Sequence, residues 1–137
     1  MSSTLTVTNL TNTNLTTTNI KATGETATRP VAGIAGSFVN YDHTTAPSNT
    51  QRDSFNTSSL VDVDTGETLI SFISAFANLG YTYAGCGGNG AAGSGHSFNG
   101  PRDVDPTTSN IRMSSVNHAG TYSERKFQTY TFFGDLA

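Results

Sequence analysis

The side chains that most often act as nucleophiles or metal ligands are few in this chain and far apart. Cys86 is the only cysteine, and the three histidines are His43, His96 and His118. A zinc site usually takes two ligands from one short stretch, and none of these four residues has another within a few positions. No serine lies in the Gly-x-Ser-x-Gly pattern of a nucleophile elbow. We therefore expect no metal centre and no catalytic residue, and the chain is interpreted as non-enzymatic.

Two further patterns match the start of a known binding motif, but the residues after each of them do not fit. Residues 62–67 bring three carboxylates together, yet the twelfth position of a calcium loop beginning there is Ile73 and not an acidic residue. Residues 88–93 match the Gly-x-Gly-x-x-Gly fingerprint, but the Gly- and Pro-containing residues 94–101 cannot open the helix that binds a pyrophosphate. We expect no cofactor.

Residues 85–109 are predicted to form a long loop, because they contain seven glycines and two prolines. Loops of this length in compact domains are usually functional or mobile. An aromatic ring can cover the apolar face of a sugar while amide, carboxylate and guanidinium groups bind its hydroxyls. We therefore predict a surface-binding loop for a sugar, with the alternative that its phenylalanine only anchors the loop; its residues are His96, Phe98, Asn99, Arg102 and Asp103.

The composition indicates an all-β protein that binds neither nucleic acid nor membrane. The 137 residues suffice for one domain of ordinary size, with 34% hydrophobic and 12% charged residues and a net charge of -3. Eight Phe, five Tyr and abundant Thr favour exposed β-sheet. The seven Lys and Arg are scattered, which argues against nucleic-acid binding. No apolar run is long enough for a membrane span, and we expect no signal peptide.

The strands expected in the second part of the chain alternate between two sets of side chains. Residues 64–67 are predicted to form a tight turn with Gly66 at positive φ, and residues 69–76 to form a central strand. In the last strand, Phe127 and Thr129 share one face while Gln128 and Tyr130 share the other. The last two strands are predicted to form a terminal hairpin. The expected strands span residues 34–41, 53–63, 69–76, 81–86, 110–117 and 126–133.

The first residues of the chain repeat with a period of five. Apolar residues recur at Leu5, Leu10, Leu15 and Ile20, three of them preceded by Thr-Asn. An odd period cannot keep these side chains on one face of a flat strand, and the pattern is similar to that of pentapeptide repeats. Four pentads make one coil at most, which cannot bury its own apolar face. We therefore predict that residues 1–30 are an extended or pentad-repeat arm that docks on a partner; the alternative is a flexible Thr/Asn tail.

Four short motifs succeed one another in the second part of the chain. Residues 36–42 read GSFVNYD, residues 54–59 read SFNTSS, residues 65–66 are Thr-Gly, and residues 78–81 read NLGY. Together with the closing FFGDLA, this order resembles a module of small structural appendage proteins of tailed bacteriophages, found in tail-fibre tips and head-fibre knobs. The resemblance covers about 100 residues; it departs from the pattern at Tyr41, where the module has Phe, and in the Gly-rich insertion after residue 85.

The resemblance implies a homotrimeric virion protein with residues 31–137 forming an antiparallel β-sandwich or jelly-roll-like knob. Its partners would be other virion proteins (capsid, portal or tail) and a host-surface glycan, and it would be located in the virion after assembly in the bacterial cytoplasm. Two alternatives remain open from the sequence. One is a capsid decoration protein (a head-fibre or cement protein) without a receptor role, and the other is a bacterial carbohydrate-binding module.

Overall fold

The computed structural model describes residues 19–20, 29–30, 35–45, 49–88, 97–102 and 104–137. The chain divides into two units, Met1–Val31 and Ala32–Ala137. In the first unit, β1 (Asn19–Ile20) pairs antiparallel with β2 (Arg29–Pro30). The predicted docking positions Leu5, Leu10 and Leu15 lie outside the described residues, and for Ile20 only the strand backbone is described. The prediction of a docking arm therefore stays a prediction.

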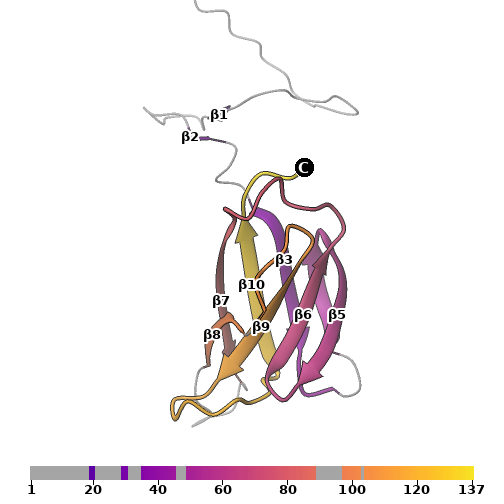
Figure 1. Ribbon diagram of the computed structural model, residues 1–137. Coiled ribbons are helices and arrows are strands. Elements are labelled where there is room, and N and C mark those ends of the chain that lie inside the picture. Colours follow the sequence, from indigo (N-terminus) through magenta and orange to yellow (C-terminus); the bar gives the residue numbers. More distant parts are fainter. Residues whose placement is uncertain (1–18, 21–28, 31–34, 46–48, 89–96, 103) are drawn as a thin grey trace, which may run out of the picture. The chain divides into compact units, whose positions relative to one another are not determined.

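The second unit consists of two four-stranded antiparallel sheets that pack face to face (Figure 1). The expected all-β fold and the β-sandwich are confirmed, and no helix in the described part of the chain is long and apolar enough to cross a membrane. The first sheet has the order β4 (Thr50–Phe55), β3 (Ala35–Asp42), β10 (Phe127–Phe133), β7 (Thr82–Gly88). The second has the order β5 (Thr57–Asp64), β6 (Glu67–Phe72), β9 (Asn110–Val116), β8 (Phe98–Pro101).

The core lies between the inner faces of the two sheets, where period-two alternation places every second side chain. Its side chains are aromatic and branched, and aromatic pairs join the two layers. The rings of Phe72 and Phe132 meet edge to face with centroids 5.2 Å apart, a favoured geometry for such pairs. The buried core consists of Val39, Tyr41, Tyr130 and Phe132 from the first sheet, Ile70, Phe72, Ile111 and Met113 from the second, and Phe76.

The single strand expected over residues 53–63 is in fact two strands in different sheets. Between β4 and β5, Asn56 adopts a φ of 56°, a conformation in which Asn is enriched among non-glycine residues. Its side-chain amide donates to the carbonyls of Gly36 (2.9 Å) and Ser74 (3.0 Å), and its oxygen accepts from the Ser74 amide (2.7 Å). These bonds hold the point where the chain crosses from the first sheet to the second. Alternation of side chains does not reveal such a crossing.

The last two strands do not form the terminal hairpin that was predicted. Strand β9 pairs with β6 and β8 in the second sheet, whereas β10 pairs with β3 and β7 in the first. The connection between them is long enough to cross from one layer to the other. The prediction was wrong because it assigned neighbouring strands in sequence to one sheet. The turn at residues 64–67 was predicted correctly, since Gly66 has a φ of 72° and joins β5 to β6.

The long loop predicted over residues 85–109 contains two strand segments where it is described. Strand β7 continues to Gly88, and residues 98–101 form β8. The glycines of β7 have a packing role: a Cβ on Gly85 would lie 2.3 Å from Cδ1 of Tyr130, and one on Gly87 would lie 2.1 Å from Oε1 of Gln128. The side chains of β10 therefore fill the space over β7. Glycine content was misleading here, because a glycine in a strand can also mark a close approach of neighbouring groups.

Candidate functional site: an open pocket on the outer face of the first sheet

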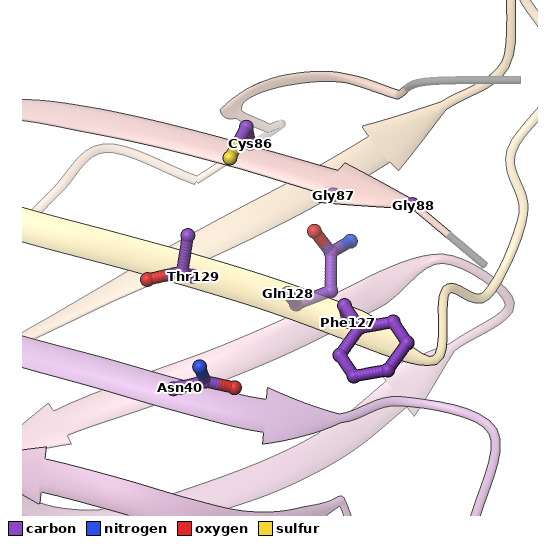
Figure 2. A pocket seen from close by; sticks show the side chains of 7 residues that line it. All are labelled: Asn40, Cys86, Gly87, Gly88, Phe127, Gln128 and Thr129. Carbon is purple, nitrogen blue, oxygen red and sulfur yellow. The ribbon is translucent and has the colours of Figure 1, made fainter. Parts of the chain in front are cut away.

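The outer face of the first sheet carries a row of polar side chains on three neighbouring strands. Thr129 of β10 pairs with Asn40 of β3 on one side and with Cys86 of β7 on the other. Tyr41 and Tyr130, the next residues along β3 and β10, point into the core and are buried. Alternation therefore turns Asn40, Thr129 and Cys86 outward, and Figure 2 shows them side by side across the sheet.

An aromatic ring closes this row at one end. Phe127 is 46% exposed and is the first residue of β10. The guanidinium carbon of Arg52 lies 4.3 Å from the centroid of the Phe127 ring, a cation–π distance. Nη2 of Arg52 also donates to Oδ2 of Asp42 at 2.8 Å. The ring and the guanidinium are thus positioned together.

Asp42 is itself held as a carboxylate, which keeps Arg52 in place. Burial on its own would raise the pKa of Asp42, but hydrogen bonds from the side chain and backbone of Thr44, and the charges of Arg52 and Lys126, outweigh it and lower the pKa below its usual value. The Thr44 bonds are 2.7 Å and 3.0 Å long. The Asp42 carboxylate is therefore charged at neutral pH, and it holds the Arg52 guanidinium beside the Phe127 ring.

The pocket exists because the residue of β7 opposite Phe127 is a glycine and has no side chain. Phe127 pairs with Gly88 across the sheet, and a Cβ on Gly88 would meet no atom within 4 Å. The resulting open pocket has a volume of about 250 Å³. This is slightly below the roughly 300 to 1,000 Å³ of pockets that hold drug-sized ligands, so it fits one small ring. It is lined by Asn40, Cys86, Gly87, Gly88, Phe127, Gln128 and Thr129 (Figure 2).

The described lining residues offer groups that can bind a ligand. Asn40 adds an amide, whose Oδ1 is buried and has no hydrogen-bond partner among the described residues. Thr129 adds a hydroxyl, and Phe127 adds a flat apolar surface. The thiol of Cys86 is exposed, and the described residues of the lining include no histidine, lysine or carboxylate that would activate it.

The residues predicted to form the surface-binding loop are divided by the structure. Phe98 of β8 is 71% exposed, whereas its neighbour Asn99 points inward, with Nδ2 3.4 Å from Oε1 of Gln128 in the other sheet. His96 and Asp103 lie outside the described residues. Phe98 and Asn99 therefore do not share one surface, because adjacent residues of a strand point to opposite faces.

Arg102 is engaged in a network of its own. Its guanidinium and that of Arg112 both pair with the buried carboxylate of Glu67. The guanidinium carbon of Arg102 also lies 3.8 Å from the centroid of the Tyr122 ring. These contacts tie the end of β8 to β6 and β9. Whether any of the predicted loop residues binds a ligand stays a prediction.

The pocket residues were not predicted from the sequence as a site, although part of the signal was present. Alternation in residues 126–133 correctly placed Phe127 and Thr129 on one face of their strand. Asn40 and Cys86 join them only through the pairing of β10 with β3 and β7. That pairing links residues that are far apart in the chain, and local patterns carry no information about it.

Comparison with known proteins adds no relative to this picture. No family model matches the chain, and neither a curated protein nor a solved structure matches it.

Proposed function

We propose that this chain is a non-enzymatic binding and structural protein, a small trimeric appendage of a bacteriophage particle whose β-sandwich displays a sugar-binding pocket. The observation that carries the binding role is the combination of an exposed ring, an unpaired amide oxygen and a hydroxyl in one open pocket. Phe127, Asn40 and Thr129 supply these groups. The assignment to a phage particle rests on the sequence motifs of residues 36–42, 54–59 and 78–81.

The chemistry of the pocket suits one sugar ring. A sugar presents a C–H face that packs on an aromatic ring, and hydroxyls that both donate and accept hydrogen bonds. Phe127 supplies the ring, and the Asn40 amide and the Thr129 hydroxyl supply groups that can donate and accept hydrogen bonds. Rings and groups on a sheet are held more rigidly than those on loops, which lowers the entropic cost of binding.

The trimer is supported by the edges of the sandwich. Strands β4 and β5 are edge strands of their sheets and expose large apolar side chains: Phe55 at 52%, Val61 at 48% and Val63 at 41%. Open edges with apolar side chains invite pairing with other chains unless they are covered. Sister subunits in a closed ring would cover them, and the arm of residues 1–30 would attach the ring to the particle.

Binding can be tested with a panel of bacterial surface polysaccharides and methyl glycosides, using the full chain and two single variants. We expect Phe127→Ala to weaken binding at least about tenfold, because a buried aromatic anchor dominates such contacts. Leu79→Ala removes another large apolar side chain, which is 62% exposed and lies outside the pocket; it serves as the matched control and should bind like the parent. No binding to any member of the panel, or equal loss in both variants, would contradict the pocket assignment.

The assembly can be tested separately. Sedimentation equilibrium of the full chain should give three times the chain mass of 14.4 kDa. Val61→Lys, which places a charge on the β5 edge, should shift the mass toward the monomer. A monomer at micromolar concentration in the parent would contradict the trimer and leave the pocket unaffected. Labelling phage particles with an antibody against the chain distinguishes a tail appendage from a capsid decoration, and an absence of label would contradict the virion assignment.

A further inference from the structure

Three segments that are far apart in the sequence converge at one end of the sandwich and bring three metal-ligating side chains together. His43 comes directly after β3, Asp62 lies in β5, and Glu124 lies in the connection between β9 and β10. The backbone amide of His43 donates to the carbonyl of Arg125 at 3.0 Å, which places Glu124 beside it. One ligand atom from each of the three side chains lies within 4.8 Å of the other two.

The His43 ring is buried, with one long hydrogen bond at Nε2 and no described partner at Nδ1. The residue is 2% exposed. Nε2 lies 3.6 Å from Oδ1 of Asp62 and 3.4 Å from Oγ1 of Thr68, both longer than an ordinary hydrogen bond of 2.7 to about 3.2 Å. Nδ1 has no hydrogen-bond partner among the described residues. A buried polar group normally has one, so this imidazole requires an explanation.

The distance between His43 and Asp62 is close to the edge of a metal coordination tetrahedron, and Glu124 lies within 4.8 Å of both. Ligands bound to zinc at roughly 2.0 to 2.1 Å are about 3.4 Å from one another in tetrahedral geometry. The separation of 3.6 Å between His43 Nε2 and Asp62 Oδ1 is too long for a hydrogen bond and close to that value. The two carboxylates also lie close together, and a divalent cation would neutralise their combined charge.

We propose that His43, Asp62 and Glu124 bind a divalent transition-metal ion of the zinc class. The imidazole selects such an ion over magnesium and calcium, which prefer oxygen ligands alone. Three protein ligands leave one coordination position for water or for a group from a partner. The ion would join the end of β3, strand β5 and the connection between β9 and β10, and thereby hold that connection on the sandwich.

The test uses the full chain with the exposed thiol removed by Cys86→Ser, so that it cannot compete for metal. After treatment with a chelator, the protein is titrated with Zn²⁺ by calorimetry and with Co²⁺ by absorption spectroscopy. We expect one saturable site per chain and the intense visible bands of tetrahedral Co²⁺. At a hundredfold excess over Kd, Zn²⁺ should raise Tm by roughly 10 °C.

Two ligand variants and one matched control decide the assignment. Asp62→Asn and Glu124→Gln replace half-buried carboxylates by amides of the same shape, and each should weaken Zn²⁺ binding at least about tenfold. Asp64→Asn changes an exposed carboxylate of the same strand and should leave binding unchanged. Circular dichroism of the metal-free variants checks that they are folded. The proposal is overturned if the parent shows no saturable site, or if binding is equal in all variants, which indicates adventitious metal.

Discussion

The substitution Gly85→Ala tests whether β7 packs against the Tyr130 ring of β10 as the structure shows. Gly85 of β7 faces Tyr130 of β10 across the sheet. A Cβ at this position would lie 2.3 Å from Cδ1 and 2.7 Å from Cε1 of the Tyr130 ring, and 2.8 Å from the carbonyl oxygen of Thr129. Tyr130 is 1% exposed, so its ring cannot move into solvent. Gly88 of the same strand has no atom within 4 Å of its Cβ position.

The magnitude is the balance of two opposing effects. Overpacking a buried site costs about 1 to 3 kcal/mol, while replacing glycine by alanine recovers about 0.4 to 1 kcal/mol of unfolded-state entropy. Gly85→Ala should therefore lower the free energy of unfolding by about 1 to 2 kcal/mol, and Gly88→Ala should raise it by about 0.5 kcal/mol. The two variants should then differ by about 8 °C in Tm, at roughly 4 °C per kcal/mol for a domain of this size.

Urea unfolding and thermal melts of both variants measure this difference directly. A double-mutant cycle with Tyr130→Leu identifies the cause, because the cost of Gly85→Ala should fall once the ring is absent. The reasoning is refuted if Gly85→Ala is as stable as Gly88→Ala. It is also refuted if the cost of the alanine does not depend on Tyr130, since the clash would then lie elsewhere.

Three further predictions concern the crossing point, the buried carboxylate and the core. Asn56→Gly keeps the backbone conformation but removes three side-chain hydrogen bonds, so urea unfolding should show a loss of about 2 to 3 kcal/mol; a loss below about 0.5 kcal/mol, the lower end for a single hydrogen bond, would contradict it. Glu67→Gln leaves Arg102 and Arg112 without their carboxylate and should cost about 1 to 3 kcal/mol, reduced because both guanidiniums are partly exposed; an unchanged urea midpoint would contradict it. Burial raises the pKa of Tyr41 to about 12, so the neutral form stabilises the fold below pH 10 and this stabilisation, about 2 to 3 kcal/mol, is lost between pH 10 and 12. Tyr41→Phe should therefore unfold at higher pH than the parent in an alkaline titration, and an unchanged transition would contradict the assignment.

Local patterns predicted the strands better than their partners. Alternation correctly assigned the opposite faces of β10, and the turn at Gly66 was predicted from residue type alone. The predicted strand over residues 53–63 was split because a single residue, Asn56, takes a left-handed conformation that its neighbours do not indicate. Glycines at Gly85 and Gly87 were interpreted as loop residues, whereas they make room for Tyr130 and Gln128.

The candidate site could also be predicted only in part, because some of its residues come together through strand pairing. The ring of Phe127 and the hydroxyl of Thr129 were predicted to share a face, but the sequence did not indicate that Asn40 and Cys86 lie on the neighbouring strands. The sequence did not connect His43 with Asp62 either, because β4 and most of β5 lie between these two residues in the chain. The predicted surface-binding residues 98 and 99 were assigned to a loop, where adjacent side chains can cooperate, but a strand separates them.

The sequence by itself determined that this protein is all-β, where most of its strands lie, and which face of each strand is apolar. These properties depend on neighbouring residues, through side-chain alternation and turn chemistry. Only the tertiary structure decided which strands pair, where the chain crosses between sheets, and which polar side chains share a pocket. Those properties depend on contacts between distant segments, and the open pocket beside Phe127 exists only because β7 brings the glycine at position 88 opposite the ring.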